Sequence, residues 1–186
     1  MAKIIMSIGR VSPDKRPQDA IKIVRIVRKS VHDAELLWVG GGSDLLNFQR
    51  LRSEEPYLNF VGELSNKWEL LRRSHAYVST SAREGFNLPI GEALLAGVPT
   101  IAYDLPVYRH VYGSVVIYIP RFDVDAFAKR VTDVLRHPER YKQTVEEGRS
   151  FVSRSYDSNA VVRQIEESIA NLLKGHSMMA NRTEIQ

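Results

Sequence analysis

Short apolar runs alternate along the chain with segments in which apolar residues recur every three or four positions. The short runs have the length and composition of β-strands, and the periodic segments are typical of amphipathic helices. We expect strands at Lys3–Ile8, Glu35–Val39, Leu58–Val61, Ala76–Ser79, Thr100–Tyr103 and Val115–Ile119. We expect helices near Pro17–Lys29, Asp44–Arg52, Asn66–Arg73, Leu88–Ala96, Val107–Val111, Asp123–Arg136, Pro138–Val152 and Ser158–Lys174.

This alternation predicts right-handed β-α-β crossovers and therefore an α/β fold. The expected architecture is a doubly wound, Rossmann-like parallel sheet of six strands with helices on both faces. We expect residues 1–175 to form one domain and the polar segment 176–186 to be a disordered tail. Ligands bind outside the carboxyl ends of the strands in such sheets, so the loops after the first, second, fourth and fifth strands form the candidate site.

Composition narrows the possible functions. The 186 residues contain no cysteine, which excludes disulfide scaffolds, thiolate zinc sites and cysteine nucleophiles. The five histidines lack ligand spacing, so we expect no metal centre. We also expect no bound cofactor. Residues 1–30 hold eight Lys and Arg against two Asp, but they include no aromatic residue, so a nucleic-acid partner is not expected. No apolar run approaches the roughly 18 residues of a membrane span.

The segment 83–97, REGFNLPIGEALLAG, contains two glutamates eight positions apart, Glu84 and Glu92. They do not belong to one simple helix face, because a glycine and Pro89 interrupt the segment between them. Pro89 suits the first turn of a helix, and Gly97 suits its end. The free N–H groups at the start of this helix are expected to face the ligand edge of the sheet, where they would form an anion site.

A carboxylate beside an anion site is useful when the ligand carries hydroxyl groups as well as phosphates, because a carboxylate accepts paired hydrogen bonds from a diol. A nucleoside diphosphate sugar has diols at both ends. We therefore expect one glutamate to reach the sugar and the other to reach the ribose, with the diphosphate between them. An equally open alternative makes Glu84 a loop acid favoured by the helix dipole and Glu92 a solvated helix residue.

Two cations follow the first strand. Arg10 and Lys15 lie five residues apart across a stretch that must turn, so both side chains can reach the same edge of the sheet. Together with a helix N-terminus they could neutralise a departing diphosphate without a metal ion. The alternative is that they are ordinary loop charges.

Two further patterns favour structural interpretations. The run Gly40–Gly42 lacks the third glycine of a dinucleotide fingerprint, because Leu45 stands in that position, and a tight turn into the next helix is favoured. The pair Asp123 and Asp125 resembles a metal-binding D-x-D, but the helical pattern that follows favours a helix cap at Asp123 and a first-turn acid at Asp125.

Taken together, these segments resemble the donor-binding domain of the retaining family 4 glycosyltransferases, which have the GT-B fold. The resemblance runs from about Ile4 to Leu173. It is carried by several motifs in order: Ser7–Arg10 with Lys15, Leu36–Gly42, Phe60–Leu64, and the E-x7-E segment Ser81–Ala93 followed by Ala96–Ala102.

The resemblance implies a role for each matching residue. Glu84 would be the catalytic residue in contact with the transferred sugar, Glu92 would bind the ribose, and Arg10 and Lys15 would bind the diphosphate. The remaining donor-binding residues would be Gly85, Phe86, Asn87 and Leu88 for the sugar and phosphates, Gly62, Glu63 and Leu64 for the base, and Gly41.

Three segments depart from the family pattern. Lys15 is followed by Arg16 and Pro17 where the family usually has glycine, which could alter the closure of the loop over phosphate. Asn87 replaces the usual small residue and could crowd the sugar or hydrogen-bond to it. The stretch 112–116 is shorter than the usual hairpin, so no site residue is assigned to it.

Family members pair this half with an N-terminal α/β domain that binds the acceptor, and nothing in the sequence corresponds to that domain. The resemblance thus implies the donor-binding half of a retaining, metal-independent glycosyltransferase that uses a nucleoside diphosphate sugar and a glycan or lipid-linked acceptor. Alone this half would be inactive, and we expect it in the cytoplasm, either free or peripheral at the cytoplasmic membrane face. Two alternatives stay open: a non-catalytic nucleotide-sugar-binding subunit or sensor, and half of a sugar-nucleotide epimerase, against which the E-x7-E arrangement argues.

Overall fold

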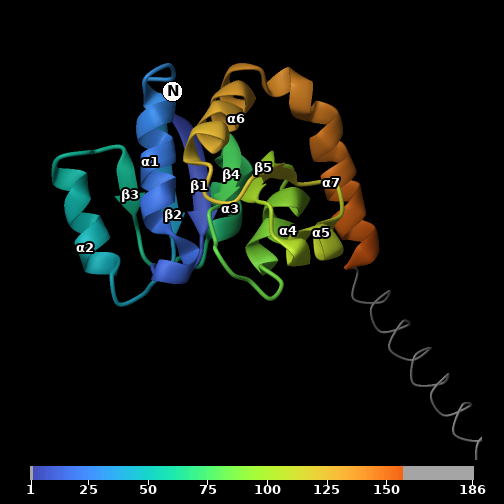
Figure 1. Cartoon of the computed structure of the whole chain (residues 1–186), viewed down its shortest axis with the longest axis horizontal. Helices are drawn as coiled ribbons and strands as arrows, with labels where there is room; N and C mark the ends of the chain where they lie inside the picture. Colours follow the sequence, from blue (N-terminus) through green and yellow to red (C-terminus); the bar gives the residue numbers. More distant parts are fainter. Residues whose placement is uncertain (1, 157–186) are drawn as a thin grey trace, which may run out of the picture. The chain divides into compact units, whose positions relative to one another are not determined.

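The computed structural model describes residues 2–156, in which six parallel strands form one sheet with the order β3-β2-β1-β4-β5-β6 (Figure 1). The strands are β1 (Lys3–Ile8), β2 (Ala34–Val39), β3 (Leu58–Phe60), β4 (Ala76–Ser79), β5 (Thr100–Tyr103) and β6 (Ile117–Ile119). The helices are α1 (Pro17–Arg28), α2 (Leu45–Arg50), α3 (Lys67–Arg73), α4 (Leu88–Leu95), α5 (Pro106–Tyr112), α6 (Val124–Arg136) and α7 (Lys142–Ser155). Short 3₁₀ helices are η1 (Pro13–Lys15), η2 (Leu51–Ser53) and η3 (Pro138–Tyr141). The predicted fold class is confirmed.

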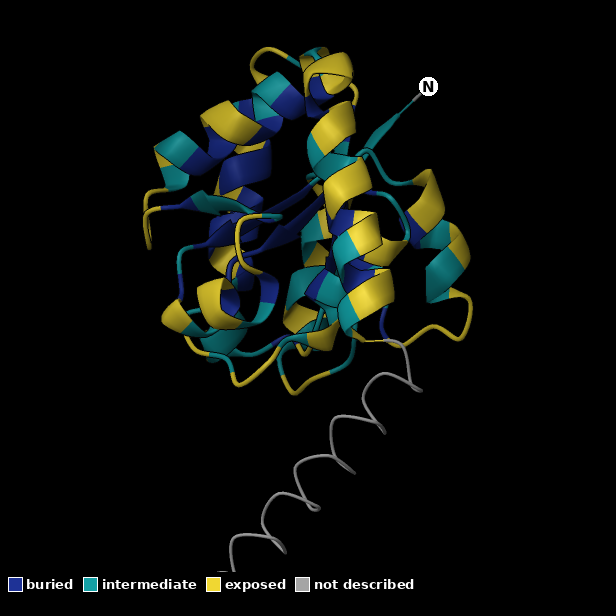
Figure 2. Cartoon of the chain, turned by 90° about the vertical axis from the view of Figure 1, so that its right-hand side faces the viewer, coloured by how far each residue is buried: buried dark blue, intermediate teal, exposed yellow. Residues whose placement is uncertain are grey.

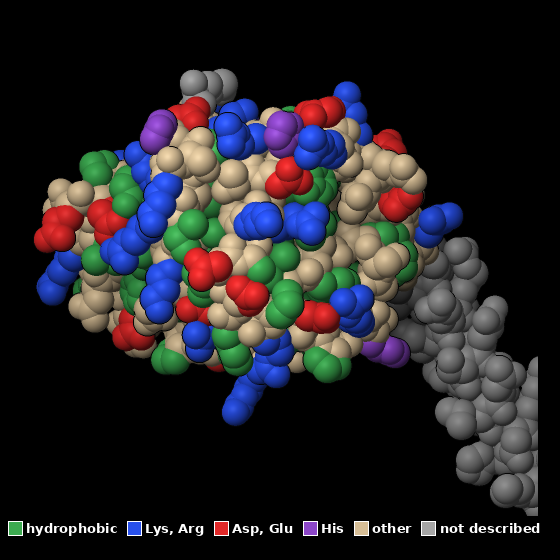
Figure 3. All heavy atoms as spheres, turned by 45° about the horizontal axis from the view of Figure 1, so that its top comes forward, with side chains coloured by type: hydrophobic (Ala, Val, Ile, Leu, Met, Phe, Trp, Pro, Cys, Tyr) green, Lys and Arg blue, Asp and Glu red, His purple; other side chains and the backbone are tan. Residues whose placement is uncertain are grey.

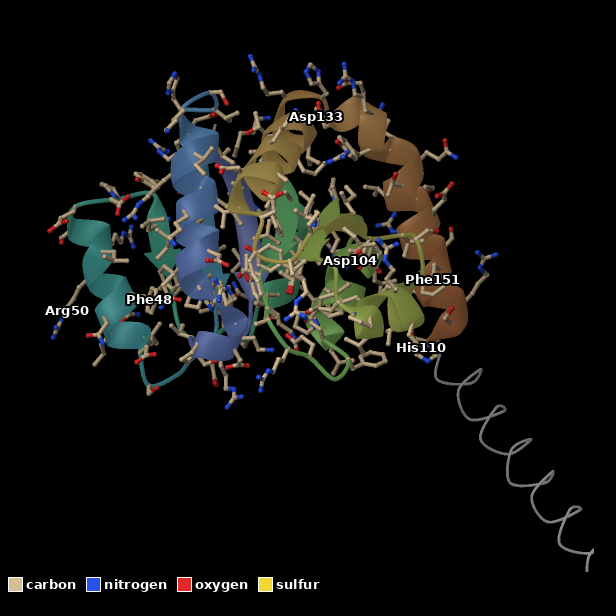
Figure 4. All side chains as sticks on the ribbon, viewed as in Figure 1. Phe48, Arg50, Asp104, His110, Asp133 and Phe151 are labelled. Carbon is tan, nitrogen blue, oxygen red and sulfur yellow. The ribbon has the colours of Figure 1, made fainter. Side chains whose placement is uncertain are left out.

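Neighbouring residues along the strands are buried on opposite faces of the sheet. Ile5 and Val78 belong to a hydrophobic cluster that includes side chains of α1 and α6 and against which α2 packs, whereas Met6 and Tyr77 are buried outside that cluster. Figure 2 shows buried residues along the strands and exposed residues on the outer sides of the helices. In Figure 4, Phe48 points from α2 toward the sheet, where its ring lies 5.0 Å from that of Phe60. Burial on both faces explains why the strands are near-continuous apolar runs in the sequence.

Some element ends differ from the predictions for visible reasons. The sixth strand begins at Ile117 rather than Val115, because the Val115 N–H bonds to the Tyr112 carbonyl in a turn that contains Gly113 at a φ of 56°. The helix predicted from Pro138 starts as η3 before it continues as α7. The predicted helix Ser158–Lys174, the boundary at residue 175 and the tail lie outside the described residues.

The order of the strands reverses in the middle of the sheet. The chain runs outward from β1 to β3 and then returns to β4, which pairs with the other side of β1. In doubly wound sheets this reversal is where ligands bind, outside the carboxyl ends of the strands. The loops that follow β1 and β4 meet there.

The chain divides into two compact units, Met1–Ser150 and Phe151–Gln186, and the whole sheet lies in the first. None of the helices within residues 2–156 is long and apolar enough to cross a membrane.

Candidate functional site

The loops after β1 and β4 are joined to each other by hydrogen bonds. The Ala82 N–H donates to the Asp14 carbonyl at 2.8 Å, and the Thr80 hydroxyl donates to the Lys15 carbonyl at 2.9 Å. These bonds fix η1 against the segment that carries Glu84. Two loops far apart in the sequence therefore form one surface at the reversal point of the sheet.

Glu84 is held through one of its two carboxylate oxygens. Its Oε1 forms an ion pair with the Lys15 ammonium and accepts hydrogen bonds from the Ser81 hydroxyl at 2.8 Å and the Asn87 amide at 2.9 Å. The side chain of Glu84 is only 10% exposed. Within the described part of the chain, Oε2 has no hydrogen-bond donor. The carboxylate is thus fixed in orientation with one oxygen available to a ligand.

Asn87 turns its side chain toward Glu84. Its backbone adopts the left-handed conformation with a φ of 62°, which asparagine tolerates better than most residues. Besides Glu84, the side-chain amide lies 3.1 Å from the Ser79 hydroxyl and 2.7 Å from the Tyr108 hydroxyl. Burial raises the pKa of Tyr108 to about 12, so this hydroxyl stays neutral at physiological pH. Asn87 therefore links Glu84 to a buried polar network.

Helix α4 begins where it was predicted, with Asn87 as its N-cap residue and Pro89 in its first turn. The N–H groups of Gly85, Asn87 and Leu88 have no hydrogen-bond acceptor among residues 2–156. Leu88 is 67% exposed. The start of α4 thus presents unpaired N–H groups at the loop that carries Glu84, as an anion site requires.

Glu92 lies one turn inside α4 in a different environment. Lys67, the first residue of α3, places its ammonium 2.7 Å from Oε1 and 2.9 Å from Oε2 of Glu92. The side chain of Glu92 is 23% exposed and that of Lys67 is 33% exposed. Both carboxylate oxygens of Glu92 are therefore occupied, and the pair is accessible to solvent.

The two predicted cations are placed differently. Lys15 lies against Glu84, whereas Arg10 is exposed and forms no ion pair within the described residues. Arg16, where the resemblance described above leads one to expect glycine, adopts a left-handed φ of 51°. Its guanidinium bonds to the buried Asp19 at 2.6 Å and lies 4.5 Å from the centre of the Phe122 ring. Arg16 is thus committed to a structural contact, and its conformation explains why glycine suits this position.

The glycine run after β2 packs against the loop after β1. A Cβ atom on Gly40 would lie 2.2 Å from the Gly9 carbonyl oxygen, and one on Gly42 would lie 2.5 Å from the Val11 carbonyl oxygen. Both glycines also have positive φ values, which supports the tight-turn interpretation.

The base-loop residues predicted for the site lie beside Gly41. Gly40 and Gly62 form an isolated β-bridge, with the Gly40 N–H 2.7 Å from the Gly62 carbonyl. A Cβ atom on Gly41 would lie 3.3 Å from a carboxylate oxygen of Glu63, and Leu64 is 36% exposed. Gly41, Gly62, Glu63 and Leu64 are therefore brought together next to the loop after β1.

The acidic pair on α6 is structural. The side chain of Asp123 accepts a hydrogen bond from the Ala126 N–H at 2.9 Å, and Asp125 lies in the first turn of the helix. The helix-cap interpretation is confirmed. The described residues contain no group of three His, Cys, Asp or Glu that could hold a metal ion.

A cavity of about 580 Å³ lies away from the predicted site, between β6 and α6. Its lining includes Tyr118, Lys129, Arg130, Arg136 and His137, and none of the predicted site residues. On the face in Figure 3, Lys and Arg side chains are interspersed with Asp and Glu.

Sequence reasoning gave no role to four residues of the site. Ser81 and Tyr108 follow β4 and β5 in the candidate loops, and Ser79 is the last residue of β4, so their positions were a usable signal. Lys67 carries no local signal, because only the packing of α3 beside α4 brings it to Glu92.

Comparison with known proteins places the chain among related sequences and folds. The model of a family described as glycosyl transferases group 1 matches residues 1–151. The N-acetyl-alpha-D-glucosaminyl L-malate synthase of Bacillus anthracis is 27% identical over 177 residues, which cover 92% of this chain and 46% of the relative. The phosphatidyl-myo-inositol mannosyltransferase of Mycobacterium leprae is 28% identical over 175 residues, with coverage of 89% and 46%. The chain spans about half the length of these relatives.

Solved structures share the fold. A Staphylococcus aureus TarM mutant, in complex with fondaparinux, alpha-GlcNAc-glycerol and UDP, has a TM-score of 0.81 at 19% identity, covering 89% of this chain and 35% of TarM. The pneumococcal O-GlcNAc transferase GtfA, in complex with UDP and GlcNAc, has a TM-score of 0.76 at 17% identity, covering 92% and 37%. The prediction of half a GT-B fold is confirmed.

Proposed function

Because this chain belongs to the glycosyl transferases group 1 family, we propose that it is the nucleotide-sugar-binding half of a retaining, metal-independent glycosyltransferase. One observation carries the proposal. Lys15, Glu84 and the unpaired N–H groups at the start of α4 meet where the order of the strands reverses. A nucleoside diphosphate sugar offers a matching series of groups: a sugar diol, a diphosphate and a ribose diol.

Glu84 is assigned to the transferred sugar. Its Oε1 is already held by three donors, and its Oε2 can accept a hydrogen bond from a sugar hydroxyl. A carboxylate fixed in this way also places negative charge near a positively charged, oxocarbenium-like sugar ring. No protein nucleophile is required, and none is assigned.

The diphosphate is assigned to Arg10, Lys15 and the main-chain N–H groups of residues 85–88. As the bond between the sugar and the diphosphate breaks, negative charge develops on the leaving phosphate oxygen. Arg10 is exposed and free of ion pairs in the described chain, so its guanidinium can turn to the phosphates. Two cations and a helix N-terminus would supply the neutralisation that other enzymes obtain from a metal ion.

The nucleoside is assigned to Glu92 for the ribose and to the loop of Gly62, Glu63 and Leu64 for the base, beside Gly41. Two solved structures of similar fold hold UDP, so uridine is the first base to test. The acceptor site is assigned to a further domain, because the relatives are about twice as long as this chain. The proposed location is the cytoplasm, and a lipid-linked acceptor would make the enzyme peripheral to the membrane.

A thermal-shift panel tests the proposal. UDP, GDP, ADP and their sugars are each added to the chain with EDTA, and at least one nucleotide should raise the melting temperature, because a ligand that binds only the folded state stabilises it. Arg10→Ala should weaken the shift for every diphosphate alike, whereas Arg72→Ala, which removes an exposed charge on α3, should leave it unchanged. A panel without any shift, or one indifferent to Arg10→Ala, would contradict the proposal. Binding without transfer after an acceptor domain is supplied would indicate a nucleotide-sugar-binding subunit instead.

A further inference from the structure

The ion pair between Lys67 and Glu92 joins two helices that begin 21 residues apart in the chain, α3 and α4. The ammonium is almost equally distant from the two carboxylate oxygens, at 2.7 and 2.9 Å. A nitrogen in that position lies in front of the open edge of the carboxylate, between its two oxygens. Lys67 therefore occupies both oxygens from one place.

A vicinal diol binds a carboxylate in the same position. Its two hydroxyl groups donate one hydrogen bond to each oxygen, across the edge that the Lys67 ammonium fills. The ammonium and the diol cannot occupy that edge together. Whatever diol Glu92 accepts must first displace Lys67.

The pair is weak enough to be displaced. The side chains of Lys67 and Glu92 are 33% and 23% exposed, and ion pairs in contact with water contribute little to stability. The flexible stem of lysine lets the released ammonium return to solvent. By contrast, the Lys15 and Glu84 side chains are 19% and 10% exposed, and two neutral donors reinforce that pair.

We propose that Lys67 masks Glu92 in the ligand-free chain and is displaced by the ribose diol, so that Lys67 sets how strongly the chain distinguishes ribonucleotides from 2′-deoxyribonucleotides. The inference rests on the proposed function, which assigns the ribose to Glu92. Breaking the ion pair between Lys67 and Glu92 costs free energy. This cost reduces the net contribution of the ribose hydroxyls to the binding free energy. Lys67 thus lowers the selectivity for ribose that an unmasked Glu92 would have.

Calorimetric titrations with UDP and 2′-deoxy-UDP test this role. The measured quantity is the Kd for 2′-deoxy-UDP divided by the Kd for UDP. In Lys67→Met this ratio should rise about two- to fivefold, mainly through tighter binding of UDP. Arg72→Met removes a positive charge from the exposed side of the same helix and should leave the ratio unchanged. Lys67→Leu provides a second unmasked variant if the methionine variant folds poorly.

Glu92→Gln distinguishes the assignment of the ribose to Glu92 from the masking role of Lys67. It should lower the ratio, because a neutral amide offers one acceptor oxygen in place of two charged ones, and adding Lys67→Met should have no further effect on it. If the ratio falls in Glu92→Gln but stays the same or falls in Lys67→Met, the masking role is overturned while the ribose assignment stands. If the ratio is indifferent to Glu92→Gln, the ribose assignment fails, and the masking role fails with it.

Discussion

Glu84 and Glu92 belong to one short segment, yet the protein surrounds them in opposite ways. Glu84 is 10% exposed and receives three donors on one oxygen, which leaves the other oxygen available. Glu92 is 23% exposed and has both oxygens covered by one lysine. Orientation of Glu84 is built into the fold, whereas Glu92 must exchange a partner before it can bind a diol. In the proposed function, the same residue type thus has a fixed orientation at one position and an exchangeable partner at the other.

Removing each carboxylate in turn should give the largest difference in stability between the two positions. Glu84→Ala leaves Lys15 without its partner in a mostly buried position and removes one acceptor each from the Ser81 hydroxyl and the Asn87 amide, so the free energy of unfolding should fall by about 3 kcal/mol. Glu92→Ala should lower it by less than about 1 kcal/mol, because the Lys67 pair is solvent-accessible. Urea denaturation measures both values. Equal losses would show that the two acids are held alike.

Substitution of Asn87 examines how Glu84 is positioned. Asn87→Ala removes the amide that bonds to Glu84 and Tyr108 and places alanine at a φ of 62°, so we expect a loss of about 2 kcal/mol. Asn87→Gly loses the same bonds but tolerates that φ, so we expect a loss of about 1 kcal/mol. The difference between the variants in urea denaturation isolates the backbone contribution. If glycine proved as damaging as alanine, the left-handed conformation would contribute nothing.

A change in salt concentration should have the smallest effect on stability, and that effect should differ between the Lys67–Glu92 and Lys15–Glu84 ion pairs. Raising NaCl from 0.05 to 0.5 M shortens the screening length, so the small stability difference between wild type and Lys67→Met should shrink by a few tenths of a kcal/mol. The larger difference between wild type and Lys15→Met should change less, because that pair is more buried and reinforced by hydrogen bonds. Parallel denaturation series at the two salt concentrations give both differences. A Lys15 effect that vanished in salt would place Glu84 among exposed ion pairs.

Much of the fold could be predicted because the apolar runs in the sequence coincide with the segments that are buried in the structure. The strands are short, largely apolar runs, and every residue of β4 and β5 is buried, while Pro89 and Gly97 mark the ends of α4 by their own conformational preferences. Errors occurred where a turn competed with a strand, as at Val115, or where a proline started a helix in the tighter 3₁₀ form, as at Pro138.

The candidate site was predictable only in part. The spacing of Glu84 and Glu92 was visible, and so was the place of Lys15 after the first strand. Which partner each acid finds depends on contacts between segments distant in the sequence: Lys15 lies 69 positions from Glu84, and Lys67 lies 25 positions from Glu92. The sequence pattern does not show which distant segments come into contact, and so it could not distinguish the environment of Glu84 from that of Glu92.

A crystal structure of the chain with a bound uridine diphosphate sugar tests the central claim most directly. The account predicts the diphosphate within hydrogen-bond distance of the N–H groups at the start of α4, with Lys15 and Arg10 beside it, a sugar hydroxyl on Oε2 of Glu84, and the ribose diol on Glu92 in place of Lys67. A ligand bound elsewhere, for example in the cavity beside Arg130 and Arg136, with Lys67 still on Glu92, would contradict it.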